Sequence, residues 1–211
     1  MLGHFLDSGR FDLKQKWTME PLSLVTDAAV TDPHAEIERL RAEIEALRRR
    51  AEMAEAAADH DVLTPVLNRR GFVAAMKSAM AFCQRHGTPA VLLYLDLDGF
   101  KGVNDSLGHA AGDAALVHVA NLLAANLRES DAVGRLGGDE FGLLMLNAGL
   151  NGGREKAKRL AEALASDAFT WNGQATALGG SFGVRAYNGH TDPEVWLAEA
   201  DAAMWMRKRG R

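Results

Sequence analysis

The eight residues from Gly134 to Phe141, Gly-Arg-Leu-Gly-Gly-Asp-Glu-Phe, constrain this chain more than any other stretch. Val133 to Leu136 and Phe141 to Leu146 have the composition of two short strands, and the glycine pair between them is a hairpin signal. A hairpin tip without side chains lets a ligand approach the backbone closely, and two adjacent carboxylates follow it. The stretch indicates either a phosphate site beside a metal or a tight turn with solvated acids.

The composition is that of a globular protein with one good core and a small additional element. Of the 211 residues, 47% are hydrophobic and 25% charged, and the net charge is -4. We therefore expect no nucleic-acid partner and no membrane insertion. The single cysteine, Cys83, excludes an internal disulfide and fits a reducing cytoplasm. No apolar run approaches the ~18 residues that span a bilayer, and the N-terminus does not resemble a signal peptide, so we expect a cytoplasmic protein.

Two segments are expected to precede the main domain, which we place at 61–211. Residues 1–33 are too short for an independent core and are interpreted as a regulatory tail. Residues 34–60 are predicted to be a coiled-coil helix that Asp32-Pro33 opens. Its a and d positions carry Ile37, Leu40, Ile44, Leu47, Ala51, Ala54 and Ala58. Isoleucine at a with leucine at d favours a parallel dimer, and the alternative is a single amphipathic helix lying on the domain.

A short apolar run introduces a second group of carboxylates. Ala90 to Leu95 is predicted to be a buried central strand that ends at Asp96. Asp98, Asn104 and Asp113 follow it closely in the sequence. We expect Asp96 and Asp139 to hold a divalent cation between them, because Mg²⁺ takes a few carboxylates and completes its shell with phosphate oxygens and water.

The rest of the chain alternates helices and strands. Asp113 is predicted to be the N-cap of an amphipathic helix from Ala114 to Leu127. Asn68 and Arg69 are interpreted as a structural cap and clamp on the helix that follows them. The other predicted elements are helices from Gly71 to His86, Arg154 to Ser166 and Pro193 to Lys208, and a strand from Ala175 to Val184. We expect an α/β fold with a central, mostly antiparallel sheet flanked by helices, preceded by the long coiled-coil helix.

Several motifs, in order along the chain, resemble those of GGDEF domains, the diguanylate cyclases. The signature is Gly137-Gly138-Asp139-Glu140-Phe141, and Asp96 to Asp105 reads Asp-x-Asp-x-Phe-Lys-x-x-Asn-Asp. The further matches are the segment from Asp61 to Phe72, Gly108-His109, Gly112-Asp113, Arg128-x-x-Asp131 and the segment that begins at Ala200-Asp201. The resemblance covers about residues 61 to 210. It implies the fold of nucleotide cyclases and polymerase palms.

The resemblance also implies a reaction. Two domains, each holding one GTP, would face each other in a homodimer and form cyclic di-GMP and two pyrophosphates, with Mg²⁺ or Mn²⁺ as the cofactor. The implied catalytic residues are Asp139, Glu140 and Asp96, and the implied metal ligands are the Asp96 side chain, the Leu97 carbonyl and Asp139. The implied substrate contacts are Gly99, Phe100, Lys101, Asn104, Asp113, Gly137, Gly138 and Lys208. The implied inhibitory product site is Arg128, Asp131 and Arg159.

Of these, Asn104 and Asp113 correspond to the residues that read the guanine. The chemistry of the base agrees for Asp113, because the Watson–Crick edge of guanine offers adjacent N–H donors that a carboxylate accepts. Adenine offers an acceptor there, and a mismatch between buried polar groups discriminates strongly.

Two segments depart from the family pattern. Pro65-Val66 stands where Gly-Leu is usual. Arg211 follows Lys208 by three residues where the family has an arginine after four, and Arg207 replaces a usual alanine.

The rival interpretation is a catalytically silent domain that acts as a receptor or scaffold for GTP or cyclic di-GMP. A regulatory protein bound at the N-terminus is a further expected partner.

Overall fold

The structure is a computed structural model that describes residues 32–209, with the side chains of all of them except 51–57. The described residues belong to two units that divide after Arg48. The first helix, α1, runs from Pro33 to Ala58. It begins as predicted, and the Asp32 side chain accepts a hydrogen bond from the His34 amide at 3.1 Å. Residues 1–31 of the predicted tail and Arg211 lie outside the described residues, and the side chains of the seam residues Ala51 and Ala54 are not described.

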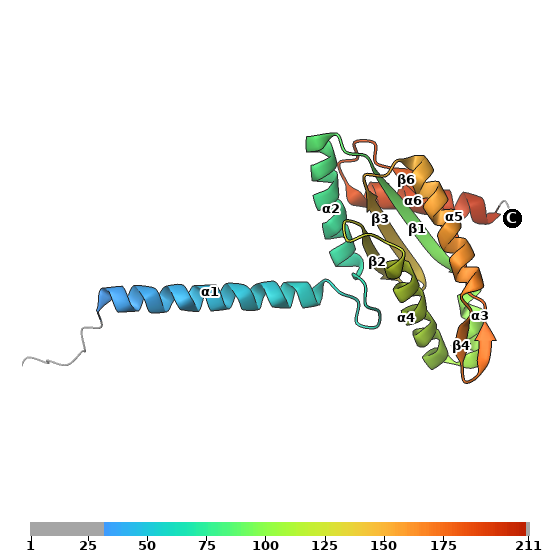
Figure 1. The fold of residues 1–211 in the computed structure, drawn as a ribbon, viewed down its shortest axis with the longest axis horizontal. Helices are drawn as coiled ribbons and strands as arrows, with labels where there is room; N and C mark the ends of the chain where they lie inside the picture. The colour runs from blue at the N-terminus through green and yellow to red at the C-terminus, as the bar shows by residue number, and fades with distance from the viewer. Residues whose placement is uncertain (1–31, 210–211) are drawn as a thin grey trace, which may run out of the picture. The chain divides into compact units, whose positions relative to one another are not determined.

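The central sheet has four strands in the order β2-β3-β1-β6, and every neighbouring pair is antiparallel (Figure 1). Their bounds are Ala90–Asp98 for β1, Ala132–Gly137 for β2, Glu140–Leu146 for β3 and Gly179–Ala186 for β6. This confirms the predicted antiparallel sheet. Because β1 is central, its apolar residues are buried on both faces.

Helices cover both faces of the sheet (Figure 1). α2 (Arg69–His86) and α6 (Pro193–Arg209) bury one cluster that includes Leu92 and Tyr94 of β1. α4 (His109–Ala125) and α5 (Leu150–Ser166) bury the other, which includes Leu93 and Leu95. The short helix α3 (Phe100–Leu107) follows β1 directly. Alternate residues of β1 therefore belong to opposite cores, as the pleat of a strand requires.

The residues before α2 fix how the chain enters this domain. The Asn68 side chain accepts a hydrogen bond from the Gly71 amide at 3.0 Å and donates to the carbonyls of Ala58 and His60. Arg69 pairs with Glu194 of α6 at 2.5 Å. Asn68 is thus a helix cap and Arg69 a clamp between two helices, which confirms the structural roles predicted for both.

Three predicted boundaries were wrong. β1 continues past Asp96 to Asp98, because its neighbour β6 extends the antiparallel pairing that far, whereas the pairing with β3 ends at Asp96. α4 begins at His109 after Gly108, so Asp113 lies in the second turn of the helix and is not its N-cap. α5 begins at Leu150 and not at Arg154, because Gly153 packs in its first turn against Val91 and Val184.

The late strand predicted from Ala175 to Val184 is two strands. β5 (Gln174–Thr176) pairs with β4 (Phe169–Trp171) in a separate two-stranded sheet. The turn between them is Asn172-Gly173, and both residues have positive φ. Asn-Gly favours such a hairpin turn, so the signal was present in the sequence but outweighed by the apolar run that follows.

The close packing of α6 against β6 positions the candidate site. A Cβ at Gly183 would lie 1.9 Å from the Ala200 carbonyl oxygen and 2.6 Å from the Met204 nitrogen. Only glycine admits a helix backbone at this distance. The approach brings the last turns of α6 to the end of β1. Among the described residues, no helix has the length and hydropathy to cross a membrane.

Candidate active site

The signature residues form the tip of the β2–β3 hairpin. Gly137 pairs with Glu140, so the two turn residues are Gly138 and Asp139 and not the predicted Gly137 and Gly138. The Asp139 carbonyl oxygen accepts a hydrogen bond from the Leu97 amide at 3.2 Å. This bond ties the hairpin tip to β1. It brings the backbone of Asp139 beside Leu97, the residue that follows Asp96.

Carboxylates gather where β1, β3 and α6 meet. Asp96 lies opposite Glu140 on β3 and opposite Ser181 on β6. Asp98 lies on the same face two residues later, and its carboxylate accepts the Ser181 hydroxyl at 2.9 Å. Asp201 of α6 is close enough for Asp96 to affect its titration. We call Asp96, Asp98, Glu140 and Asp201 the acidic cluster.

Lys208 of α6 supplies a positive charge to this cluster. Its Nζ contacts Asp96 Oδ1 and lies 3.6 Å from Asp98 Oδ1. The hydrogen bond with Asp96 raises the pKa of Lys208. The family resemblance implied that Lys208 contacts the substrate, whereas in this structure its partners are carboxylates. The contact shows that the position between Asp96 and Asp98 accommodates a cation.

Tyr94, which neighbours the acidic cluster, and Asp201, which belongs to it, have raised pKa values. Burial raises the pKa of Tyr94, and the charges of Glu140 and Asp201 raise it further. Burial also raises the pKa of Asp201, with Asp96 as the second cause. Sequence reasoning assigned no role to Tyr94 or Asp201. Asp201 was within a recognised motif, but nothing local indicated that α6 would bring it to Asp96.

The oxygen ligands offered by these residues suit a hard cation whose remaining coordination positions are filled by substrate and water. Among residues 32–209, no three His, Cys, Asp or Glu side chains lie in a geometry that would hold a metal ion. Asp96 and the hairpin tip offer carboxylate and carbonyl oxygens, and no sulfur or imidazole ligand is among the residues predicted here. Mg²⁺ is commonly held by one or two carboxylates together with substrate phosphates and water. The residues are therefore compatible with Mg²⁺ or Mn²⁺.

The predicted base-binding residues lie together between α3 and α4. A Cβ on Gly112 would lie 1.9 Å from Asn104 Oδ1 and 3.3 Å from the Phe100 ring. Because Gly112 has no side chain, the Asn104 amide can pack directly on the backbone of α4. Asp113 is the next residue and is exposed. The structure thus brings Asn104 close to the backbone beside Asp113, although they belong to different helices.

The predicted phosphate contacts lie where β1 passes into α3. Gly99 has φ 73° and directly precedes Phe100, the first residue of α3. Phe100 is partly buried, and the Lys101 side chain is exposed. This segment follows Asp98 immediately, so it adjoins both the acidic cluster and the residues around Asn104.

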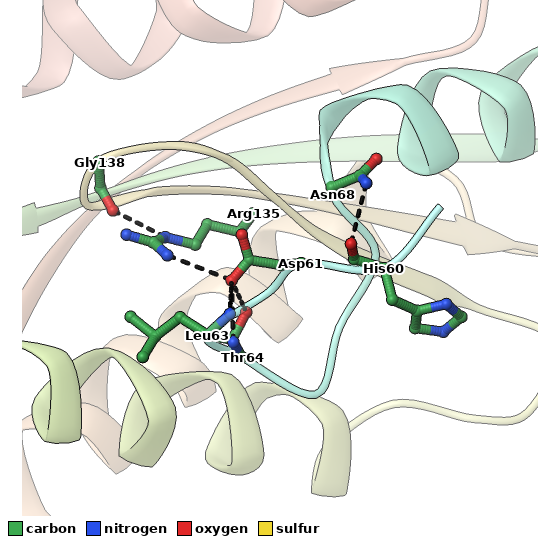
Figure 2. A network of polar contacts seen from close by, with 7 residues as sticks. All are labelled: His60, Asp61, Leu63, Thr64, Asn68, Arg135 and Gly138. Carbon is green, nitrogen blue, oxygen red and sulfur yellow. Dashed lines mark hydrogen bonds and ion pairs between the residues drawn. The ribbon is translucent and has the colours of Figure 1, made fainter. Parts of the chain in front are cut away.

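A half-buried ion pair connects the hairpin to the turn before α2 (Figure 2). Arg135 Nη1 lies 3.2 Å from Asp61 Oδ1, and Arg135 Nε donates to the Gly138 carbonyl at 2.9 Å. Asp61 also accepts hydrogen bonds from the Thr64 amide and hydroxyl. Sequence reasoning assigned no role to Arg135. The spacing of Asp61 and Thr64 is that of a side-chain-capped turn, which is the signal that was missed.

Two of the predicted inhibitory residues, Arg128 and Asp131, lie at the other end of the sheet from the hairpin tip. The Arg128 amide donates to Asp131 Oδ2 at 3.1 Å, and Asp131 Oδ1 accepts the Leu146 amide at 3.3 Å. Glu140 begins β3 and Leu146 ends it, so about 20 Å of strand separates this turn from the hairpin tip. The side chains of Arg128 and Arg159 are exposed, and neither forms an ion pair within the described part of the chain.

A groove that sequence analysis did not predict follows the outer edge of β6. Its volume is about 790 Å³. α5 forms one side, and Arg207 of α6 and Asp98 of β1 also contribute to it. We call it the β6-edge groove. Because Asp98 belongs to both, the groove opens beside the acidic cluster.

The sequence matches a known protein family over the whole of the domain that carries the candidate site. The model of the diguanylate cyclase GGDEF domain matches residues 58–211. The chain belongs to the GGDEF family, which confirms the resemblance found in the sequence.

Three relatives illustrate the similarity. The probable diguanylate cyclase DgcE of Escherichia coli K12 is 39% identical over 155 residues, which are 72% of this chain but only 14% of DgcE. The coiled coil and GGDEF domain of DgcB from Caulobacter crescentus, solved in complex with c-di-GMP, gives a TM-score of 0.73 at 27% identity, over 84% of this chain and 94% of that one. Diguanylate cyclase SiaD of Pseudomonas aeruginosa, solved with its activator SiaC, gives 0.69 at 32% identity, over 84% and 71%.

Proposed function

We propose that this protein is a diguanylate cyclase that condenses two GTP molecules into one cyclic di-GMP. The observation that carries the proposal is the register of β1 and β3, which sets Asp96 opposite Glu140 with Asp139 at the adjoining turn. The acidic residues of the signature and Asp96 therefore lie close together at one end of the sheet. Guanine-binding residue types follow on α3 and α4.

In the proposed reaction, the 3′-oxygen of each GTP forms a bond to the α-phosphorus of the other and loses its proton. The bond from each α-phosphorus to its bridging oxygen breaks, and pyrophosphate leaves. Two such steps give one cyclic product and two pyrophosphates. The Asp96 side chain, the Leu97 carbonyl and Asp139 would hold Mg²⁺ or Mn²⁺, which when bound polarises the α-phosphate and stabilises the developing charge.

The protein residues orient the substrate in this scheme. The Asp113 carboxylate would accept hydrogen bonds from the guanine edge, where the Asn104 amide can both donate and accept. The amides of Gly99 and Phe100, with Lys101, would lie along the phosphates. Gly137 and Gly138 leave the backbone of the hairpin open to the substrate. Lys208, the present partner of Asp96, is suited to exchange that carboxylate for a phosphate oxygen when GTP binds.

One domain holds one GTP, so the reaction requires two chains. The residues of α1 that support a dimer are Ile37, Leu40, Ile44 and Leu47, whose exposed fractions are 45%, 44%, 48% and 55%. Four large apolar side chains on one stripe of a polar helix are typical of a coiled-coil seam. We assign residues 34–60 to the coiled-coil segment, whose helix ends at Ala58, residues 61–211 to the cyclase domain and residues 1–33 to the regulatory segment.

Two regulatory contacts belong to the proposal. Arg128, Asp131 and Arg159 would bind cyclic di-GMP and limit its accumulation, because exposed guanidinium groups pair well with phosphates and guanine edges. DgcB was solved with c-di-GMP and SiaD with an activator. By analogy, a partner protein would act on this chain through its N-terminal segment. We also propose a cytoplasmic location.

The test is incubation of the purified chain with GTP and Mg²⁺, with the product identified by chromatography. We expect cyclic di-GMP from the wild type and none from Asp139→Ala. Arg128→Ala should give a higher sustained yield, because product inhibition is relieved. A dimer that binds GTP but forms no product would contradict the cyclase and support the receptor interpretation.

A further inference from the structure

The C-terminal helix presents two consecutive cations to the substrate side of the sheet. Lys208 reaches the carboxylates of Asp96 and Asp98. Arg207 points to β6, where its Nη1 donates to the Phe182 carbonyl at 3.5 Å. Phe182 adjoins Ser181, whose hydroxyl binds Asp98. Arg207 and Lys208 therefore border one continuous surface around Asp98.

Arg207 is held weakly in its present position. It donates a long hydrogen bond to the uncharged Phe182 carbonyl, and no carboxylate within residues 32–209 forms an ion pair with it. Its side chain is exposed. A guanidinium in this setting gives up little when it turns to an anion. It also presents a planar fork that matches phosphate oxygens.

The β6-edge groove that Arg207 borders is otherwise mixed in charge. Lys158 is 3.8 Å from Glu162 on the same helix, so those two charges offset each other. Glu155 and Arg154 lie farther along α5. Arg154 and Arg207 both line the groove without an ion pair among residues 32–209, and Arg207 is the one that contacts Phe182, next to the Ser181–Asp98 hydrogen bond. The groove gives the terminal phosphates room beyond Lys208 without entering the protein core.

We propose that Arg207 binds the β- and γ-phosphates of the substrate nucleotide and the pyrophosphate released from it. The inference rests on the proposed cyclase function, in which the triphosphate extends past Lys208. The pyrophosphate then leaves along the β6-edge groove. On substrate binding, Arg207 would leave the Phe182 carbonyl and bind phosphate oxygens. Lys208 would likewise leave Asp96 and bind a phosphate oxygen.

Equilibrium binding to the full-length chain tests this. The ligands are 3′-deoxy-GTP, which lacks the attacking hydroxyl and cannot turn over, and GMP, which lacks the β- and γ-phosphates. We expect Arg207→Gln to weaken 3′-deoxy-GTP binding about tenfold and to leave GMP binding unchanged, because one charge-assisted phosphate contact is lost. The affinity of Arg207→Lys for 3′-deoxy-GTP should lie between those of the wild type and Arg207→Gln. Glutamine keeps an N–H donor but loses the charge, so a role limited to covering the strand edge would leave both affinities unchanged.

Arg209→Gln is the matched control. Arg209 lies two residues farther on α6, with its guanidinium carbon 5.5 Å from the centre of the Trp205 ring. The Arg209→Gln variant should bind both ligands with wild-type affinity. Equal affinity of Arg207→Gln and wild type for 3′-deoxy-GTP, or equal losses for both ligands, would overturn the proposal while leaving the cyclase function intact. Failure of the wild type to bind 3′-deoxy-GTP would overturn the proposed function and the inference with it. In turnover assays, inhibition by added pyrophosphate should weaken in Arg207→Gln.

Discussion

Arg135 on β2 and Asp61 in the turn before α2 form an ion pair of 3.2 Å in which each side chain is only 16% exposed. The same guanidinium donates to the carbonyl of Gly138 at the hairpin tip (Figure 2). One side chain therefore joins the segment that follows α1 to the turn that carries Asp139. A pair this well shielded from solvent is costly to break on one side only.

Arg135→Met should both destabilise the domain and slow turnover. The substitution leaves the Asp61 carboxylate without its charged partner and releases the Gly138 carbonyl, so we expect a loss of about 2 kcal/mol in unfolding free energy. Turnover should fall more in Arg135→Met than in Asp61→Asn, because only the first removes the bond to the hairpin. Urea unfolding and initial rates measure the two effects. Equal rates in the two variants would show that the hairpin does not depend on Arg135.

The pH dependence of stability follows from the Asp61 carboxyl. Burial alone raises its pKa, but hydrogen bonds from Thr64 and the contact with Arg135 outweigh this and hold the pKa below its ordinary value of 3.8. A lowered folded-state pKa contributes stability above the unfolded-state pKa, and this stability is lost as pH falls through the folded value. Asp61→Asn should be less stable than wild type by about 2 kcal/mol near neutrality, and the difference should close below about pH 4. A gap that persists in acid would contradict this origin.

Gly112→Ala should impair recognition of the base. The new methyl group would lie 1.9 Å from Asn104 Oδ1, so the amide must move. We expect weaker GTP binding and a smaller preference over ATP, both measurable by equilibrium titration. Gly102→Ala is the control, because that glycine is also helical and a Cβ there meets nothing within 4 Å. It should bind GTP normally and gain about 1 kcal/mol of stability from helix propensity.

The exposed seam of α1 predicts an oligomer that one substitution should dissociate. Leu40→Glu places a charge at a d position of the heptad, and we expect monomers that bind GTP but make no cyclic di-GMP. Ala42→Glu adds the same charge at an f position on the outer side of the seam and should remain dimeric and active. Sedimentation and product assays distinguish the two variants. Normal turnover by a monomeric Leu40→Glu would refute the role of the coiled coil.

Cys83 should be inert in the folded protein. It is buried in α2 with 3% of its surface exposed, and burial raises the pKa of its thiol. Because the thiolate is the reactive form, we expect no modification by a thiol reagent at neutral pH and complete reaction in denaturant. The native labelling rate should therefore follow global unfolding. Rapid labelling without unfolding would indicate that α2 opens locally.

The sequence by itself determined the parts that depend on local pattern. The glycine pair between two apolar strands indicated the hairpin, Asp32-Pro33 indicated the start of α1, and the motif series indicated the family. These features are legible because strand alternation, proline geometry and glycine turns act over a few residues. Helix starts were harder to predict, since Gly108, Gly112 and Asp113 are all suitable cap residues and the structure uses Gly108.

Only the tertiary structure decided which distant residues meet. Asp61 and Arg135 are 74 residues apart, and Asp96 and Lys208 are 112 apart. Lys208 reaches Asp96 because Gly183 lets the α6 backbone lie directly on β6, and Asp201 joins the cluster for the same reason. Such contacts follow from how helices pack on a sheet and not from local propensity. No periodicity in the sequence records them.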